Sequence, residues 1–290
     1  MKTEIIDLED PSYSCTKANS FPIAKDRAIG GWINQKPFIC GGYDGGPGSS
    51  ISSLCYNLHD NGEWKKDQTS LNIPRRSSAK GSVVMNGNHL VVAGGSSGTG
   101  QFLNTIEVVT PSSGSKTLST KLPSDTFGGC IVKWDHTTFA VIGGYGGKRQ
   151  STTFVDLITD TYSAGPKLNI GRSYLACHEM TFKGETFIVV TGGGDEDGKR
   201  KSTEVLSKSS PNNQWQKGKD LPVDHLYHDM VAFDGSLYTI SKNGIYKLSC
   251  DGANSITDCQ WKATGGKMKY PREKAVAISV SNAFADKICN

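Results

Sequence analysis

The sequence predicts an all-β chain that folds as one domain, residues 1–290: a six-bladed β-propeller with four antiparallel strands in each blade. Glycine accounts for 34 of the 290 residues, where average usage of about 7% would give about 20. Apolar runs that end in a Gly-Gly doublet recur at near-constant spacing, and no stretch shows the apolar period of a helix. Together these features indicate a ring of similar β-sheets.

The doublets define the repeat. They begin at four positions that are offset by 53, 49 and 49 residues, namely Gly41, Gly94, Gly143 and Gly192. Turns such as Asn86-Gly87 separate the run that ends in a doublet from an earlier apolar run, and such turns favour a tight hairpin. Another short apolar stretch follows 10 to 15 residues after each doublet. An aromatic residue then closes most units: Trp64, Tyr162, Trp215 and Trp261. Each unit therefore reads as four strands.

The last two repeats are less regular. The fifth has residues 237–241 where the doublet should be. We expect the sixth to be split, with residues 273–280 and 284–289 as its first two strands and residues 4–8 and roughly 13–16 as its outer strands. Residues 3–17 would then pair with residues 270–290 in the closing blade, which leaves no free sheet edge.

These residues resemble the Kelch repeat, and the chain is similar to a stand-alone Kelch propeller. The shared features are the doublet, an Arg at the start of the inner strand, the outer Trp, and a Leu-Pro before a new blade, as in Leu122-Pro123 and Leu221-Pro222. The resemblance covers essentially the whole chain, although the second repeat lacks the outer Trp and the fifth and sixth lack the doublet. No oligomerisation or adaptor domain adjoins the repeats in this sequence, so a ligase-adaptor role has no support.

Residues at the starts of the inner strands form the candidate site. In an antiparallel hairpin, the start of the first strand and the end of the second lie at one edge, so these residues and the loops after the doublets share one face, here called the mouth. We expect a partner to bind there through the following side chains: Arg27, Arg76, Arg172, Arg272, His225, Tyr43, Tyr145 and Tyr174. A guanidinium binds carboxylates and phosphates bidentately, and the resemblance implies that acidic peptide segments bind on this face. The alternative is that the arginines bond to backbone or to loop carboxylates such as Asp44 and Asp195, and that the tyrosines pack.

Three motifs suggest an enzyme or a metal site, and each has a simpler explanation. Residues 94–98 match G-x-S-x-G, but they lie in a doublet loop between strands, whereas a nucleophile elbow needs a strand-to-helix turn. Asp220, Asp224 and His228 are similar in spacing to the iron site of the plant specifier proteins, but solvated carboxylates explain them better. The acidic loop at residues 195–198 lacks the later Glu of an EF-hand. The ligand set of the copper-radical oxidases, which use a similar propeller, cannot be assembled. We therefore predict no catalytic residue, no metal and no cofactor.

Composition and cysteines limit the remaining classes. The net charge of +4 is spread along the chain, which argues against nucleic acid, and no apolar run approaches the roughly 18 residues of a membrane span. The N-terminus has no apolar signal-peptide core. Three cysteine pairs are candidates for disulfides, Cys40 with Cys55, Cys250 with Cys259 and Cys15 with Cys289, while Cys130 and Cys177 read as small buried residues. These pairs slightly favour an extracellular setting over a cytoplasmic one.

The sequence thus predicts a non-enzymatic binding module that recognises a protein segment with acidic groups on its mouth, without nucleic acid or membrane insertion. Two alternatives stay open. In the first, the chain is a small-molecule or metal-binding protein, an enzyme included, that uses the central channel. The chain could also be a cytoskeletal cross-linker, because Kelch proteins include actin binders.

Overall fold

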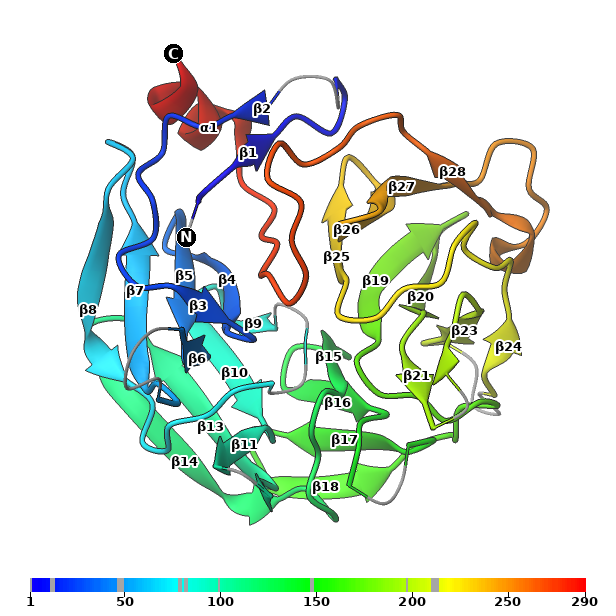
Figure 1. The fold of residues 1–290 in the computed structure, drawn as a ribbon. Coiled ribbons are helices and arrows are strands. Elements are labelled where there is room, and N and C mark those ends of the chain that lie inside the picture. Colours follow the sequence, from blue (N-terminus) through cyan, green and yellow to red (C-terminus); the bar gives the residue numbers. More distant parts are fainter. Residues whose placement is uncertain are drawn as a thin grey trace.

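The chain forms a ring of β-sheets around a central axis (Figure 1). This computed structural model describes residues 2–10, 14–45, 50–77, 80, 83–98, 100–146, 149–196, 198–209 and 214–290. Within that part of the chain, five sheets have four strands each, and every strand pair in them is antiparallel. We number these sheets as blades 1 to 5 and give the strands of each from the innermost to the outermost.

Blade 1 consists of β4 (Ile29–Ile33), β5 (Lys36–Cys40), β7 (Leu54–Leu58) and β8 (Trp64–Ser70). Blade 2 consists of β9 (Val84–Met85), β10 (His89–Ala93), β13 (Thr105–Thr110) and β14 (Gly114–Lys121). Blade 3 consists of β15 (Cys130–Lys133), β16 (Thr138–Ile142), β17 (Thr152–Asp156) and β18 (Thr161–Ala164). Blade 4 consists of β19 (Ala176–Phe182), β20 (Glu185–Thr191), β23 (Thr203–Ser207) and β24 (Gln216–Lys217). Blade 5 consists of β25 (Asp229–Phe233), β26 (Ser236–Ser241), β27 (Gly244–Ser249) and β28 (Gln260–Ala263).

Short elements complete the described chain. Four two-stranded ladders lie outside the blades: β1 (Ile5–Ile6) with β2 (Ser14–Cys15), β3 (Lys25–Asp26) with β6 (Tyr43–Asp44), β11 (Ser96–Gly98) with β12 (Gln101–Phe102), and β21 (Gly194–Asp195) with β22 (Gly198–Lys199). The described helices are the 3-10 helix η1 (Ile256–Asp258) and the α-helix α1 (Asn282–Cys289). No described helix has the length and apolarity needed to cross a membrane.

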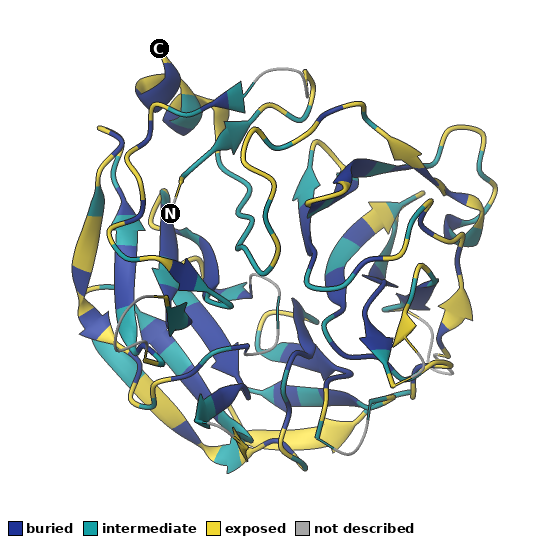
Figure 2. Cartoon of the chain, viewed as in Figure 1, coloured by how far each residue is buried: buried dark blue, intermediate teal, exposed yellow. Residues whose placement is uncertain are grey.

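The apolar core lies between neighbouring blades. One buried cluster joins Val91 of β10 to Phe139 of β16, and another joins Ile142 of β16 to Val190 of β20. The inner strands are accordingly more buried, whereas each outermost strand exposes at least half of its residues, all four of them in β18 (Figure 2). Face-to-face burial of this kind explains why the inner strands read as continuous apolar runs in the sequence.

The glycine doublets allow a close approach between blades. Gly94 has a φ of +65°, and a Cβ atom there would lie 2.3 Å from the carbonyl oxygen of Thr126 in the loop that enters the next blade. A side chain cannot fit at that distance, and an L-residue would also be strained at that φ. The doublet is therefore required by the packing of one blade on the next.

The loops that enter the inner strands are joined in a closed cycle. Each contributes one residue with positive φ, whose N–H donates to the carbonyl oxygen of the equivalent residue in the preceding loop. In order, the donors and distances are Ser77 to Arg27 (3.0 Å), Gly128 to Ser77 (2.9 Å), Tyr174 to Gly128 (2.5 Å), Tyr227 to Tyr174 (3.2 Å), Lys274 to Tyr227 (3.3 Å) and Arg27 to Lys274 (3.0 Å). The cycle has six members, although the described chain contains five four-stranded blades.

The expectation of a sixth four-stranded blade is wrong for the described residues. Residues 273–280 are in no strand, and residues 282–289 form helix α1 instead of a second strand. The helix is favoured locally because Ser281 caps it by accepting from the N–H of Phe284, and because Phe284 and Ile288 are buried on one face. The N-terminal strands β1 and β2 do pair with each other, but not in a common ladder with residues 270–290. Tyr13, at the start of the expected second strand, lies outside the described residues.

Four disulfides cross-link the chain. Three are those suggested by the sequence, Cys15–Cys289, Cys40–Cys55 and Cys250–Cys259. The fourth, Cys130–Cys177, links the inner strands of blades 3 and 4, so the prediction that these two cysteines are merely buried residues is wrong. Their positions at the starts of adjacent inner strands bring the two Cα atoms to 6.0 Å, within the range for a disulfide.

Candidate functional site: the mouth of the propeller

The loops expected to form the mouth do lie at one face. The loop entering the inner strand of blade 1 pairs with the loop after its doublet, as β3 with β6. Isolated bridges repeat this pairing in blades 2, 3 and 4: Arg76 with Ser96, Phe127 with Tyr145, and Ser173 with Gly194. Blade 5 has no doublet, and its entry residue His225 pairs with Arg200 in the loop of blade 4. Residues from both kinds of loop are therefore neighbours on this face.

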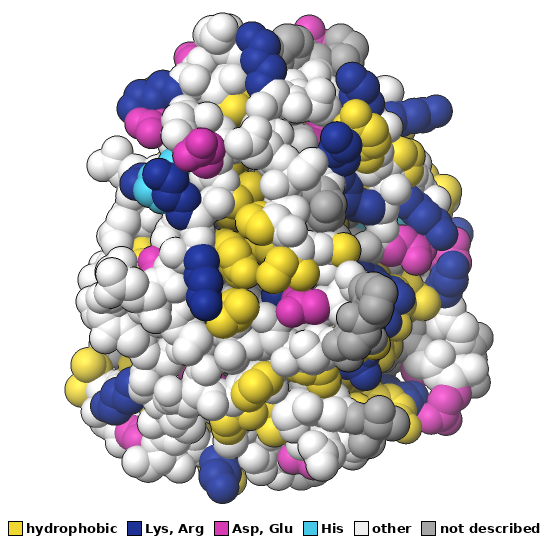
Figure 3. All heavy atoms as spheres, turned by 60° about the vertical axis from the view of Figure 1, so that its left-hand side comes forward, with side chains coloured by type: hydrophobic (Ala, Val, Ile, Leu, Met, Phe, Trp, Pro, Cys, Tyr) yellow, Lys and Arg dark blue, Asp and Glu magenta, His cyan; other side chains and the backbone are white. Residues whose placement is uncertain are grey.

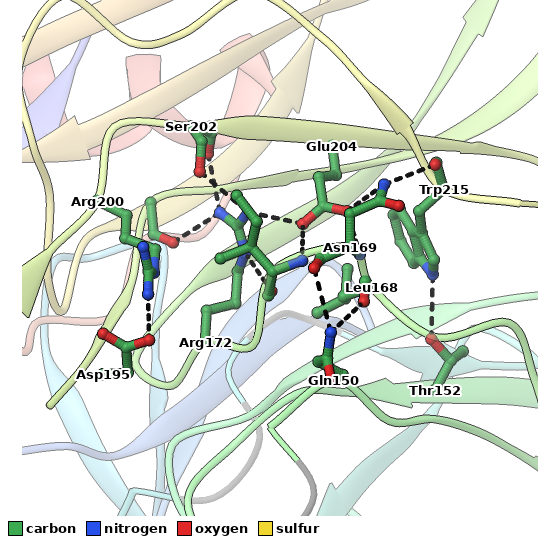
Figure 4. A network of polar contacts seen from close by, with 12 residues as sticks. Gln150, Thr152, Leu168, Asn169, Arg172, Asp195, Arg200, Ser202, Glu204 and Trp215 are labelled. Carbon is green, nitrogen blue, oxygen red and sulfur yellow. Dashed lines mark hydrogen bonds and ion pairs between the residues drawn. The ribbon is translucent and has the colours of Figure 1, made fainter. Parts of the chain in front are cut away.

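Arg172 does not line the mouth, because its side chain is fully buried. Its guanidinium donates to the carbonyl oxygens of Gly192 (2.9 Å) and Ser202 (2.9 Å) and pairs with a Glu204 carboxylate oxygen at 2.7 Å (Figure 4). The remaining bonds go to the Ser202 hydroxyl and the Ile170 carbonyl oxygen. A guanidinium has five N–H donors, and these five bonds use all of them. The expectation that Arg172 binds a partner is thus corrected, since it ties the entry loop of blade 4 to its second and third strands.

Arg75 repeats this arrangement in blade 2. It donates to the carbonyl oxygens of Gly94 (2.9 Å) and Thr105 (3.0 Å), and it pairs with the buried carboxylate of Glu107. In both blades the second carboxylate oxygen of the Glu accepts the N–H of an Asn before the arginine, Asn72 or Asn169, at 2.7 Å. We call this arrangement the Arg–Glu clamp. The sequence contains its signal twice, as Asn-Ile-x-Arg followed by Glu 32 residues after the Arg.

Arg272 forms a third Arg–Glu clamp. It lies in the part of the ring between blade 5 and blade 1, which we call the sixth sector. Its Nη2 lies 2.9 Å from a Glu4 carboxylate oxygen, and its Nη1 donates to the Lys2 carbonyl oxygen. Its side chain keeps 20% of its exposure, where the side chains of Arg75 and Arg172 have none. Arg272 is therefore held by the chain itself, and its predicted role in partner binding is not supported by its contacts.

His225 takes the clamp position in blade 5 and is buried, with 2% of its surface exposed. Its ring stacks on His228 at 5.2 Å, and His228 Nε2 lies 2.9 Å from the Thr191 hydroxyl. Burial lowers the pKa of both imidazoles, and that of His228 falls well below its usual value. The predicted contact of His225 with a partner is corrected, because a buried neutral ring offers no charge at the surface. Among the described residues, no three His, Cys, Asp or Glu side chains are grouped as metal ligands.

A group of cationic and aromatic side chains does lie on the entry loops of the mouth. We call it the mouth cluster: Arg27, Arg76, Tyr174, Tyr227 and Lys274. The rings of Tyr174 and Tyr227 are 4.2 Å apart, and the Lys274 ammonium lies 5.0 Å from the centre of the Tyr227 ring. All five residues are half-buried. Burial raises the pKa of Tyr174, and the nearby charges of Arg27 and Arg76 oppose that rise.

Two further groups extend the mouth cluster. Arg76 lies over the Tyr43 ring at 4.9 Å, and its buried Nε has no hydrogen-bond partner among the described residues. On the other side Phe127 contacts Tyr174 at 5.6 Å and continues through Phe102 to Tyr145, whose ring carries Arg149 at 4.9 Å. Sequence reasoning identified Tyr43, Tyr145, Tyr174, Arg27 and Arg76, and the structure brings them to this face. It missed Tyr227, Lys274 and Phe127, which occupy equivalent positions in other loops.

The motifs that suggested an enzyme are part of ordinary loop structure. Ser96 of the G-x-S-x-G match lies in β11, is buried, and donates its hydroxyl to the Gly98 carbonyl oxygen at 2.6 Å. Asp195 of the acidic loop pairs with Arg200. Asp197 lies outside the described residues.

The chemistry of the mouth cluster suits two kinds of group. Its cations can hold an anionic group, and its rings can hold a flat or apolar group.

Comparison with known proteins supports the fold. No protein-family model matches the chain, and no curated protein matches its sequence. Among solved structures the chain is similar to YjhT, with a TM-score of 0.66 and 13% identity over 86% of each chain. Identity at this level concerns the fold alone. Together with the five four-stranded sheets in a ring, it establishes that the chain is a β-propeller.

Proposed function

We propose that the chain is a non-enzymatic binding module of the Kelch type, and that a protein segment with acidic groups docks on the mouth cluster. The carrying observation is the set of cations beside aromatic rings on the entry loops: Arg76 over Tyr43, Lys274 over Tyr227, and Arg27 and Arg76 near Tyr174. The clamp arginines are excluded from this role because their donors are already used inside the blades.

The charge of the whole surface supports a local rather than a general attraction. Acidic and basic side chains are interspersed on the face seen in the space-filling view (Figure 3), and the net charge is only +4. An acidic segment would therefore be selected by the few cations of the mouth cluster. Four disulfides are typical of an oxidising compartment, so we propose that this partner is met outside the cytosol.

The test compares fluorescent peptides that differ only in charge. A ten-residue peptide library with Glu at alternate positions is selected on the protein, and the best binder is remade with Gln at each Glu. We expect the Gln form to bind at least tenfold more weakly, and the Glu form to weaken as salt rises. Arg27→Ala with Arg76→Ala should reduce the affinity of the Glu form by about 10- to 100-fold, because each removes a charge-assisted bond.

The matched control is Lys66→Ala, which removes a cation from the exposed face of β8. It should leave binding unchanged. A selected peptide that binds equally well as its Gln form, or that ignores both arginine substitutions, would refute this function.

One observation favours a second candidate, a small-molecule protein that uses the central channel. Two buried imidazole nitrogens, His225 Nε2 and His228 Nδ1, have no hydrogen-bond partner among the described residues. Mass spectrometry of the protein isolated from its source under native conditions tests this reading. Extra mass that is lost in His228→Ala would favour the channel over the mouth.

A further inference from the structure

The sixth sector of the ring contains the third and fourth strands of an incomplete blade. Glu4, beside β1, holds Arg272 as Glu107 of β13 and Glu204 of β23 hold their arginines. Trp64 donates its indole N–H to the Thr3 hydroxyl at 2.8 Å, just as Trp261 donates to Thr203 of β23 at 3.0 Å. Both contacts identify β1 as the third strand of this sector, and β2 pairs with it as the fourth.

Residues 275–280 occupy the position of the innermost strand. They follow Lys274, which is the sixth member of the loop cycle. The N–H of Ala277 donates to the carboxylate of Asp229 in β25, the inner strand of blade 5, at 2.9 Å. Their sequence, Ala-Val-Ala-Ile-Ser-Val, alternates larger and smaller residues as a strand does. They nevertheless pair with no strand in the described chain.

No described residues form a second strand in this sector, and a cavity lies at its position. The chain leaves residue 280 for helix α1 and does not turn back along residues 275–280. The cavity has a volume of about 670 Å³ and is bounded by residues 275–280, by residues 3–10, by Val231 and Ile240 of blade 5, and by Ile39 of blade 1. It therefore separates the innermost strand position from β1.

Unused hydrogen-bonding groups border this cavity. Within the described chain, residues 276 and 278–280 make no main-chain hydrogen bond. The clamp is also incomplete. Arg75 and Arg172 each donate to a doublet glycine of the second strand, Gly94 or Gly192, whereas Arg272 has only the equivalent contact to the third strand, through Lys2. Unpaired main-chain groups next to a cavity with apolar side chains in its wall favour the arrival of another strand.

We propose that an extended segment of a second polypeptide inserts between residues 275–280 and β1 and completes the sixth blade. The other blades specify its chemistry: four or five apolar residues, antiparallel to residues 275–280, followed by Gly-Gly. The first glycine would offer its carbonyl oxygen to Arg272. The glycines are needed because the doublets of the other blades lie at positive φ. The next blade leaves no room for a side chain at the first glycine, and the entry loop of the same blade leaves none at the second. Main-chain hydrogen bonds give such strand addition its affinity, and alternate side chains give its specificity. This site adjoins the mouth cluster at Tyr227, but Arg27 and Arg76 do not line it.

The probe is a synthetic peptide with the sequence of residues 185–193, which supplies the second strand and doublet of blade 4. Fluorescence anisotropy with the full chain should show one peptide bound per protein. Hydrogen exchange at the amides of residues 276–280 should slow by at least tenfold on binding. A peptide with Val190→Pro, which lacks one amide and disrupts extended pairing, should bind at least tenfold more weakly.

Two variants locate the site. Ile240→Lys places a charge in the cavity and should weaken peptide binding at least tenfold, whereas Ile158→Lys, at a side chain that is 76% exposed in blade 3, should not. Arg27→Ala with Arg76→Ala should leave this peptide's affinity unchanged, which separates the site from the proposed function of the mouth. The proposal is overturned by absence of binding, by unchanged exchange at residues 276–280, or by equal binding of the Val190→Pro peptide. Tight binding of an apolar dye that the peptide does not displace would assign the cavity to a small ligand instead.

Discussion

The Arg–Glu clamp predicts that Arg172→Ala severely destabilises the protein. The side chain is fully buried, and its five N–H donors are all used by Ile170, Gly192, Ser202 and Glu204. Removing it leaves the Glu204 carboxylate buried without its counter-charge and leaves the Ile170 and Gly192 carbonyl oxygens without the Arg172 donor. The Ser202 carbonyl oxygen still accepts from the Gly192 N–H at 3.1 Å. The N–H groups of Asn169 and Ile170 still hold that carboxylate, which prevents a complete loss of its contacts.

The expected cost follows from the geometry. Removing one partner of a buried, hydrogen-bonded ion pair costs about 3–5 kcal/mol, a large part of the about 5–15 kcal/mol that stabilises a typical protein. Scaled from domains of 150–250 residues, this corresponds to a fall in melting temperature of roughly 6–20 °C. Arg76→Ala should cost about 1 kcal/mol or less, because it removes a half-buried cation–aromatic contact. Arg172→Lys should be intermediate, since it keeps the charge but loses the planar fork.

Denaturant unfolding of the three variants, followed by tryptophan fluorescence with the disulfides intact, tests this order. Circular dichroism at low temperature checks that each variant folds. If Arg172→Ala lowers the free energy of unfolding no more than Arg76→Ala does, the clamp does not stabilise the blades. The prediction that Arg172 binds a partner at the mouth would then be favoured again.

Three further predictions follow from other parts of the ring. Loop-closure entropy gives about 4 kcal/mol for the disulfide Cys130–Cys177, which spans 47 residues, and about 2.6 kcal/mol for Cys250–Cys259, which spans 9. In urea unfolding, replacing both cysteines of the first pair with Ser should cost more stability than replacing both of the second, and the reverse order would contradict this. Because the pKa values of His225 and His228 are lowered in the folded protein, the unfolded chain binds protons first as pH falls. The free energy of unfolding should therefore fall below about pH 6.5, by up to about 1.4 kcal/mol per pH unit for each histidine. In urea titrations the unfolding free energy of His228→Gln should depend less steeply on pH, and an unchanged dependence would contradict this. Gly94→Ala should lower the melting temperature more than Gly87→Ala does, because both glycines have positive φ but only Gly94 has atoms within 4 Å of the added Cβ. Equal effects would mean that the packing around the doublet is not tight.

The sequence allowed prediction of the repeating part of this fold because that part is fixed by local chemistry. The doublet glycines and the Asn-Gly turn mark positions where only certain residues fit, so the blades with doublets could be assigned from spacing alone. The sixth sector has neither signal, and the expected closure of the ring by a complete sixth blade is not borne out in the described residues. A helical signal was present there, in Ser281 as a cap and in the four-residue spacing of Phe284 and Ile288, but it is short beside the β pattern.

The candidate site was predicted less well because adjacent residues have opposite roles. Arg75 and Arg76 follow each other, and only the register of the clamp shows that the first is buried and the second lies at the mouth. That register depends on a Glu 32 residues later, a contact between strands that local pattern does not display. The disulfide Cys130–Cys177 was missed for the same reason, since it depends on how two neighbouring blades face each other.

The loop cycle gives the strongest argument for where function lies on this ring. Each of its six positions has positive φ, a conformation that glycine adopts most easily, yet only Gly128 is a glycine. The other five are Arg27, Ser77, Tyr174, Tyr227 and Lys274, and each of these non-glycine residues bears backbone strain on the order of 1–2 kcal/mol. The backbone hydrogen bonds of the cycle do not need these side chains. Strain retained at positions where glycine would form the same backbone hydrogen bond points to use of the side chain. Because four of the five belong to the mouth cluster, the same positions that close the ring are those at which we expect a partner to be recognised.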